Sequence, residues 1–428
     1  MPTGTTRSYE ARVQSETTSL YREHYGRILA SLIRALGNFE LAEDALQDAF
    51  AAAVEQWPRE GVPNNPAGWI ASTARHKAID KARRQSWFSE RRDEIQRLIE
   101  FEMSSDSDDN ADSFPDERLR LIFTCCHPAI NREAQIALSL RTLCGLTTEE
   151  IARAFVTPTA TMAQRIVRAQ RKIRAAGIPY EVPSGDALPE RLESAMAVIY
   201  LVFNEGYLAS SGDEVVRKDL CAEAIRLARI LSALMPDQRE ARGILALMLL
   251  HDSRRETRAD SNGDLILLED QDRSRWDHRQ IVEGLTLVTA AMSGATQGPY
   301  AIQAAIAAEH ARAKRSGDTD WARIAQLYAM LFEMRPTPII ALNHAVAIAM
   351  ARGLGEGLAL IEELEASGEL NYYYLMWSAK ADLLRRIGNY IDAASAYRRA
   401  LEVVTSNPDR RFLERRLAQM ASGTVQRQ

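Results

Sequence analysis

Residues 147–174 read TTEEIARAFVTPTATMAQRIVRAQRKIR, and this stretch decides the fold. Its pattern predicts two short helices joined by a tight turn. Thr147 and Glu150 make a capping box at the start of the first helix, and Thr157 with Pro158 is placed to start the second. Helical spacing predicts one buried stripe along the second helix, made of Met162, Ile166, Ala169 and Ile173.

The other side of the second helix is strongly basic. No acidic residue occurs between Glu150 and Glu181, and the cationic side chains that lie off the apolar stripe are Arg165, Arg168, Arg171, Lys172 and Arg174. A short capped helix, a tight turn and a basic second helix are what a helix-turn-helix needs to enter a DNA major groove. The alternative is a helical hairpin whose basic face is simply solvated.

The composition of the whole chain sets the structural class. The 428 residues suit roughly two to four domains. Alanine, leucine, arginine and glutamate recur at helical spacing while strand patterns are nearly absent, so the fold class is all-α. A net charge of −5 restricts any nucleic-acid contact to local basic faces. There is neither a signal peptide nor an apolar run that could span a bilayer, so we expect a cytoplasmic protein without membrane contact.

The cysteines argue against a metal or redox site. Cys125, Cys126, Cys144 and Cys221 lack the paired spacing of zinc ligands, and adjacent cysteines cannot readily bind one tetrahedral ion. We therefore interpret Cys125-Cys126-His127 as structural. No motif combines a nucleophile, a base and an oxyanion site, so we expect no catalytic residue, no cofactor and no metal.

An acidic helix is predicted in the N-terminal part of the chain. After a helix that ends at Gly37, residues 40–57 carry one apolar face. The opposite face is expected to carry the acids Glu40, Glu43, Asp44 and Asp48. An acidic face alone is usually just solvated. Here it precedes a basic segment, so the two faces could bind different partners.

The basic segment begins after a loop at residues 58–65, where Asn65 can cap the helix that follows. Trp69 is expected in the core. The side chains left for an anionic partner are Arg75, Lys77, Lys81, Arg83 and Arg84. Trp87 and Phe88 follow at the helix end, where they either pack against the helix or offer unstacked bases a platform beside the charge.

The order of these parts is diagnostic. An acidic helix (AEDALQDAF) precedes a basic helix (NPAGWIASTARHKAIDKARR), an acidic linker follows, and a helix-turn-helix ends in RIVRAQRKIR. Over residues 18–178 this order resembles the extracytoplasmic-function class of sigma-70 family factors of bacterial RNA polymerase. The resemblance implies a disordered N-terminus at 1–17, a helical region 2 bundle at 18–95, an acidic linker at 96–117 and a helix-turn-helix region 4 at 118–178.

The resemblance also implies roles for single residues. The clamp helices of the largest subunit of core RNA polymerase would contact Glu43, Asp44, Gln47 and Asp48. The promoter −10 element would be melted and bound by Asn64, Asn65, Arg75, His76, Lys77, Asp80, Lys81, Arg83 and Arg84. The −35 element would be bound by Thr159, Thr161, Gln164, Arg165, Arg168, Arg171 and Lys172. The flap of the second-largest polymerase subunit is the further partner implied.

A long extension follows a linker at residues 179–189. Near its end, WSAKADLLRRIGNYIDAASAYRRALEVVTSNP has the spacing of a tetratricopeptide repeat, and residues 221–250 and 341–364 look like looser copies. Such helix pairs stack into a solenoid whose concave side normally binds a partner, so a regulatory protein is expected on residues 190–428. The whole chain resembles the sigma-factor subgroup with an extension of this kind.

One segment does not fit the solenoid pattern. Within residues 258–277, Asn262-Gly263 predicts a hairpin turn and residues 265–268 are the best strand candidate. A calcium loop is rejected because Gln271 stands where the bidentate glutamate would be required. We therefore expect a small hairpin insertion between helices.

The sequence indicates a transcription initiation factor with a regulatory extension. The rival from another class is a helix-turn-helix regulator with a repeat sensor domain that does not join polymerase, but it leaves residues 40–92 unexplained. A third possibility is a helical scaffold with a degenerate DNA-binding module. Charge reversal at Asp44 and Asp48 distinguishes these hypotheses, because only the sigma-factor hypothesis predicts loss of core-polymerase binding.

Overall fold

The computed structural model confirms an all-α fold for the part of the chain that it describes. No strand is present among these residues. They are 20–21, 24–36, 38–84, 115–143, 145–155, 157–184, 186–207, 218–261, 263–294 and 296–425. The expected disordered N-terminus, most of the expected acidic linker and the pair Trp87-Phe88 lie outside them.

The chain forms two compact units, Met1–Ile199 and Tyr200–Gln428. Helix α9 (Ala187–Tyr207) runs across the boundary. Its first half belongs with the N-terminal unit, because Arg191 donates to the carbonyl of Phe123 (2.6 Å) and Ser194 donates to that of Cys126 (3.0 Å).

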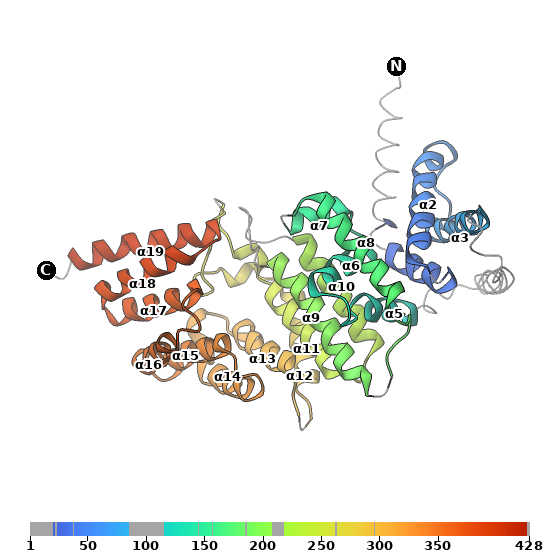
Figure 1. The fold of residues 1–428 in the computed structure, drawn as a ribbon. Helices are drawn as coiled ribbons and strands as arrows, with labels where there is room; N and C mark the ends of the chain where they lie inside the picture. The colour runs from blue at the N-terminus through green and yellow to red at the C-terminus, as the bar shows by residue number, and fades with distance from the viewer. Residues whose placement is uncertain are drawn as a thin grey trace, which may run out of the picture. The chain divides into compact units, whose positions relative to one another are not determined.

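The N-terminal unit begins with a helical segment at residues 24–36, then α2 (Phe39–Glu60) and α3 (Pro66–Arg84) (Figure 1). The amides of Glu40 and Leu41 donate to the Asn38 side chain at the start of α2. Apolar residues at helical spacing form the core, and its largest side chains are Tyr25, Leu29, Ile33, Leu46, Phe50 and Trp57.

The boundary between α2 and α3 differs from the prediction in one respect. Pro58 was expected to open the loop, but α2 continues to Glu60 with Pro58 in its last turns. A proline there removes one hydrogen bond, to the carbonyl of Val54. Val54 lies on the exposed side of the helix, where water can donate to that carbonyl. The prediction that Asn65 caps α3 is confirmed, since its side chain accepts from the amide of Gly68 (2.9 Å).

The second part of the N-terminal unit is a compact group of short helices. Pro115 starts the first of them, so the expected linker ends three residues earlier than predicted, at residue 114. A proline is favoured at a first helical position because its missing N–H has no partner there. The helices are α5 (Pro115–Cys125), α6 (Arg132–Thr142), α7 (Thr148–Ala154) and α8 (Thr159–Ala175).

The helix-turn-helix has the predicted capping box and the predicted buried stripe. The amide of Thr147 donates to the Glu150 carboxylate (2.7 Å), and the amide of Glu150 donates to the Thr147 hydroxyl (3.1 Å). The prediction that Thr157 caps the second helix is wrong. Its hydroxyl donates to the carbonyl of Phe155 (3.0 Å), and Pro158 is the cap residue of α8, without a side-chain bond. The stripe is Met162, Ile166, Ala169 and Ile173.

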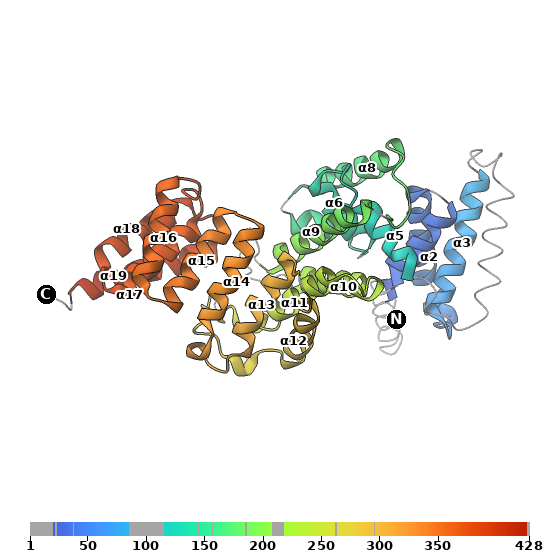
Figure 2. The same cartoon turned by 90° about the horizontal axis from the view of Figure 1, so that it is seen from below.

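The C-terminal unit is an array in which each helix packs on the next along the chain (Figure 2). No described helix of the protein is long and apolar enough to cross a membrane. Short 3-10 turns lie at Arg255–Thr257, Arg273–Arg275 and Ser316–Asp318. The helices are α10 (Lys218–Leu234), α11 (Arg239–Asp252), α12 (His278–Ala291), α13 (Pro299–Arg312), α14 (Trp321–Met334), α15 (Pro338–Ala351), α16 (Leu354–Ser367), α17 (Tyr374–Ile387), α18 (Tyr390–Val403) and α19 (Asn407–Val425).

Small residues allow these helices to pack closely. Gly388 ends α17 with φ at 90°, a conformation that favours glycine. In the contact between α15 and α16, a Cβ on Gly357 would lie 2.6 Å from the carbonyl oxygen of Ala345. Of the positions in α18 that match the repeat pattern, Ala393, Tyr397 and Ala400 are buried, and Tyr390 and Leu401 are half-buried.

The insertion is a turn held by backbone bonds rather than a stranded hairpin. Residues Ala259 and Leu265 form one isolated antiparallel bridge, and the amide of Ile266 donates to the carbonyl of Arg258 (2.8 Å). The predicted strand at 265–268 is therefore wrong, because pairing stops after this single bridge. Of the predicted turn, Gly263 has φ at 75°, while Asn262 lies outside the described residues.

Arginines of the last helices hold this insertion. Arg411 of α19 donates to the Asp264 carboxylate (2.6 Å) and Arg415 bonds its other oxygen. Nη2 of Arg386 in α17 donates to both carboxylate oxygens of Glu269 (2.8 and 2.7 Å). The insertion thus joins parts of the C-terminal unit that are well over a hundred residues apart in sequence.

Candidate nucleic-acid interface

Packing between α2 and α3 fixes which of their side chains point outward. The rings of Trp57 and Trp69 meet edge to face with centroids 5.5 Å apart, and Ile70 and Ala74 are buried. Trp69 therefore packs against the core as expected, but it remains half-buried. Because the apolar sides of the two helices face each other, their acidic and basic sides are presented outward.

Three of the predicted polymerase-binding residues lie on the outer side of α2. Asp44 and Gln47 are exposed and Asp48 is half-buried. Lys81 of α3 places its ammonium 2.9 Å from the carboxylate of Asp48 and 3.7 Å from that of Asp44. An ion pair this exposed stabilises a protein by less than about 1 kcal/mol, so these carboxylates can exchange Lys81 for another partner.

The predicted −10 residues line the loop and one side of α3. Asn64, Asn65, His76 and Asp80 are exposed, while Arg75, Lys77 and Lys81 are half-buried. Cationic groups that keep part of their surface in water can contact phosphates without a large desolvation cost. Arg83 and Arg84 belong to the last turn of α3, but their side chains lie outside the described residues.

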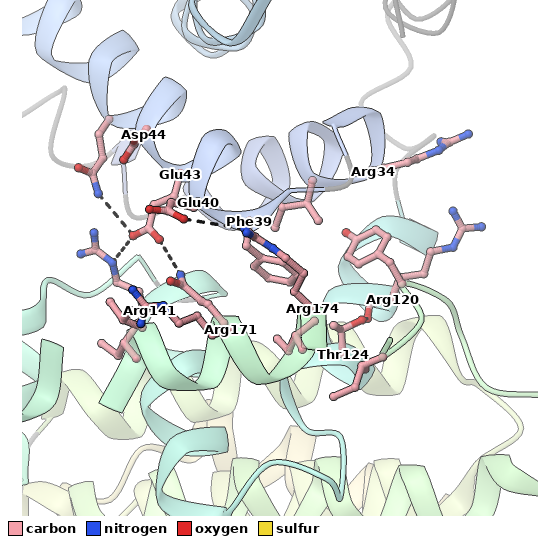
Figure 3. A pocket seen from close by; sticks show the side chains of 18 of the residues that line it. Arg34, Phe39, Glu40, Glu43, Asp44, Arg120, Thr124, Arg141, Arg171 and Arg174 are labelled. Atoms are coloured by element: carbon pink, nitrogen blue, oxygen red, sulfur yellow. Dashed lines mark hydrogen bonds and ion pairs between the residues drawn. The ribbon is translucent and has the colours of Figure 1, made fainter. Parts of the chain in front are cut away.

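Glu43 is the exception on α2. It was expected on the outer acidic face, but only 9% of the residue is exposed. Its carboxylate accepts hydrogen bonds from Arg141 of α6 and from Gln170 of α8 (3.0 Å), and Figure 3 shows it pointing toward these helices. The physical reason is helical phase. Glu43 stands three residues before Leu46 and seven before Phe50, both of which are buried, so it lies at the edge of the apolar stripe.

Tyr25 and Arg141 both lie within hydrogen-bond distance of Glu43. Burial, and next the Glu43 charge, raise the pKa of Tyr25 well above its usual value, so Tyr25 keeps its proton and lies within hydrogen-bond distance of Glu43 (3.5 Å). Burial is the largest single influence on the pKa of Arg141 and lowers it, but Glu43, Tyr25 and Tyr21 together outweigh burial, and the net shift is upward. Arg141 therefore stays cationic beside Glu43.

The predicted −35 residues lie along α8 and divide between two of its sides. Thr161, Gln164, Arg168 and Lys172 are exposed, and Arg165 is half-buried. These five line one groove of about 560 Å³ beside residues 129–134. Arg171 instead lines a second cavity, of about 720 Å³, that α8 shares with α2 (Figure 3). Thr159 is exposed at the start of the helix.

One predicted −35 residue already has an acidic neighbour. The guanidinium of Arg165 lies 2.9 Å from the carboxylate of Glu133, which is itself 73% exposed. A duplex phosphate or base edge would have to compete with that carboxylate. The exposure of Glu133 makes this competition inexpensive.

The adjacent cysteines are structural, as interpreted from the sequence. Cys125 Sγ lies 3.1 Å from the Thr142 hydroxyl, and Cys126 Sγ lies 3.6 Å from that of Ser139. Burial raises the pKa of Cys126 to about 11, which keeps it a thiol. No group of histidine, cysteine and acidic residues suited to a metal occurs within the described part of the chain.

Sequence reasoning missed Arg141 and Gln170. Both bond Glu43 across about a hundred residues of chain, so helical periodicity could not pair them. One signal was present in the sequence. Arg141 interrupts the apolar run IALSLRTLC, where a charged side chain needs an acidic partner.

Comparison with known proteins agrees with this geometry. Residues 20–88 match the model of sigma-70 region 2, and residues 191–292 match a family of unknown function (DUF6596). An uncharacterized protein of Rhizobium meliloti (strain 1021) is 42% identical over 404 residues, which cover 92% of this chain and 93% of that protein. The match at residues 20–88 supports a sigma-70 family factor, and the chain as a whole belongs to the same family as this Rhizobium protein.

Proposed function

We propose that this sigma-70 family factor is a transcription initiation factor of the extracytoplasmic-function class. It binds core RNA polymerase and directs recognition and melting of promoter DNA. The observation that carries the proposal is the α2–α3 pair within the region 2 match, where one helix presents acids outward and the next presents cations. A regulator that only reads duplex DNA has no need of such a pair.

The acidic side of α2 contacts the clamp helices of the largest polymerase subunit. Its contact residues are Asp44, Gln47 and Asp48, with Glu43 beside them at the edge of the face. Complementary charge across such a contact raises the association rate and fixes the orientation more than it raises affinity. Region 4 contacts the flap of the second-largest subunit.

The loop before α3 and the outer side of α3 melt and bind the −10 element. Asn64 and Asn65, which are exposed in this loop, bind an extruded base, and extrusion into a pocket offsets part of the cost of unstacking. Cations follow for the backbone of the separated strand. The residues proposed on α3 are Arg75, His76, Lys77, Asp80, Lys81, Arg83 and Arg84.

Helix α8 enters the major groove at the −35 element. Arginine bonds guanine in a bidentate manner, which makes Arg165 and Arg168 the principal candidates for base contacts. Arg171 and Lys172 contact phosphates, and Thr159, Thr161 and Gln164 lie on the side of α8 that enters the groove. Each lost phosphate contact reduces the salt dependence of binding by about one unit of slope.

The C-terminal unit is a regulatory, tetratricopeptide-like extension that operates in the cytoplasm. Helices that pack in chain order are typical of a solenoid, and a solenoid offers a partner-binding surface. A chain that ends at residue 199, compared with the full chain, should show altered promoter output in cells. Circular dichroism on the shorter chain would control for loss of its helices, and identical output across growth conditions would contradict this role.

Transcription reconstituted from purified core polymerase, the full-length protein and genomic promoters tests the proposal. Promoter-specific transcripts are expected only when the factor is present. Arg168→Ala should abolish most of that transcription, whereas Arg315→Gln, which alters an exposed ion pair in the C-terminal unit, should not. Duplex binding without any binding to core polymerase would favour the helix-turn-helix regulator instead.

A further inference from the structure

The contact between regions 2 and 4 in the N-terminal unit lies beside the proposed polymerase-binding face and buries one of its residues, Glu43. Glu43 is the hub of this contact. Its two carboxylate oxygens bond different helices of region 4: one accepts from Arg141 of α6, and the other accepts from Gln170 of α8 at 3.0 Å. Figure 3 shows Glu43 between α2 and these helices, with Arg171 and Arg174 on the same side.

Other contacts extend along the same surface. Arg174 of α8 donates to the Asn38 side chain (3.2 Å), and Tyr180 donates to the carbonyl of Ala30 (3.1 Å). The backbones approach closely at Gly26, where a Cβ would lie 2.5 Å from the carbonyl oxygen of Leu143. Region 4 therefore lies against both the 24–36 segment and α2.

This contact has the features of one that can open and close rather than of a packed core. We call the bonds of Glu43 to Arg141 and Gln170 the Glu43 latch. The contact leaves an open cleft of about 720 Å³ between the helices, so the two sides are not packed against each other as side chains in a core are. Its central interaction is a charged group, which is tolerated in a buried position only while its partners are present. When the modules separate, Glu43 returns to water and needs no partner.

The residues that line this cleft show which part of α2 lies beside region 4. Asp44 and Gln47, which we propose as polymerase contacts, line it together with Glu43 and Glu40. Across from them are Val167, Gln170 and Arg171 of α8. Asp44 and Gln47 remain exposed themselves, but a polymerase subunit that contacts them together with Glu43 would collide with α8.

We propose that region 4 masks the polymerase-binding face of region 2, and that core polymerase binds only after the Glu43 latch with Arg141 and Gln170 opens. This inference rests on the proposed function, because it presumes that α2 is the polymerase contact. It gives Glu43 two successive roles, first toward Arg141 and Gln170 and then at the surface of the opened factor. It also makes Arg141 and Gln170 regulatory positions that touch neither polymerase nor DNA.

The test breaks the latch from the region 4 side and leaves α2 intact. Full-length Gln170→Ala and Arg141→Gln are compared with wild type for binding to purified core polymerase. A hydrogen bond to a charged group shifts an equilibrium by roughly 10- to 150-fold. The apparent dissociation constant is the intrinsic one divided by the fraction of competent molecules, so each variant should bind at least about 10-fold more tightly until the open form predominates. Arg315→Gln, an arginine change in an exposed pair of the C-terminal unit, should bind as wild type does.

A distance measurement gives a readout that does not depend on polymerase. Spin labels on noncanonical residues placed at exposed Glu55 in α2 and exposed Ala175 at the end of α8 report the separation of the modules. The wild type should give one short distance, and both variants should add a longer one. Circular dichroism identifies any variant that has simply lost helix, and Gln170→Ala, which removes a half-buried amide, is the milder of the two changes.

The outcomes are separable. Tighter binding by both variants with longer distances supports masking. Equal binding and unchanged distances, with a wild type that does bind core polymerase, overturn the latch and leave the proposed function standing. If no form binds core polymerase while all keep their helices, the proposed function fails, and masking fails with it.

Discussion

Glu240 offers a sharp test of how the C-terminal unit is held together. Its carboxylate, on α11, accepts hydrogen bonds from the amides of Tyr300 and Ala301 in the first turn of α13, both at 2.9 Å. Tyr300 is 6% exposed and Ala301 is fully buried, so water cannot easily replace the acceptor. Gly298 makes room for it, since a Cβ there would lie 2.1 Å from the carboxyl carbon. We predict that Glu240→Ala loosens α13.

The magnitude follows from the two bonds. A hydrogen bond to a charged group contributes about 1.5–3 kcal/mol, and a carboxylate at a helix N-terminus adds roughly 0.3–1 kcal/mol. The bonds share one carboxylate and are not additive, so we expect Glu240→Ala to cost about 2–4 kcal/mol. Glu240→Gln keeps one acceptor oxygen without the charge and should cost roughly half as much.

Native-state hydrogen exchange on the full-length chain measures this directly. A single unfolding curve would not serve, because a chain with two compact units need not unfold in two states. Peptides within residues 299–312 should exchange roughly 30- to 700-fold faster in Glu240→Ala. Glu362→Gln, at an exposed position on α16, is the control and should change nothing. Exchange within threefold of wild type in Glu240→Ala would refute the argument that this carboxylate holds α13.

Other positions give independent tests. Reversal of Asp44 and Asp48 to arginine should abolish core-polymerase binding in a pull-down while the melting temperature stays within a few degrees, because their ion pair is exposed; a large drop in melting temperature would mean a structural role. Gly243→Ala should lower the melting temperature, since a Cβ would lie 2.7 Å from the amide nitrogen of Ala301, and an unchanged melt would contradict that contact. The hydrogen bond from Arg411 holds the pKa of the Asp264 carboxyl below its usual range. The stabilisation that ionised Asp264 gives to α19 is therefore complete above about pH 4, and it is lost as the pH falls through the lowered folded-state pKa. Exchange in α19, corrected for intrinsic rates, should rise in that window in wild type but not in Asp264→Asn, and an equal rise in both would contradict it.

Local features of the sequence predicted the local structure well. The capping box at Thr147 and Glu150, the cap at Asn65 and the stripe along α8 depend only on neighbouring residues, so spacing is sufficient to find them. Thr157 failed for a local reason too. Its hydroxyl donates to the carbonyl of Phe155 instead of accepting from the first amides of α8.

The site could be predicted only in part, because helical periodicity gives faces and not partners. The outward positions of Asp44 and Gln47 follow from their phase on α2. Glu43 sits at the margin between faces, and its position was decided by Arg141 and Gln170, which no local pattern connects to it. The separation of Arg171 from the other −35 residues has the same origin, since it depends on which helix lies opposite.

Arg386, Arg411 and Arg415, which bond the insertion, change how the C-terminal array unfolds under force or heat. In an ordinary solenoid each repeat contacts only its neighbours. The ends can therefore unfold one helix pair at a time. Here Asp264 bonds Arg411 of α19 and Glu269 bonds Arg386 of α17. These bonds close a loop of well over a hundred residues. Loss of the last helix must break these ties as well, so the array should open as one block. A partner that broke the pairs of Asp264 and Glu269 with these arginines would therefore allow the whole array to open at once.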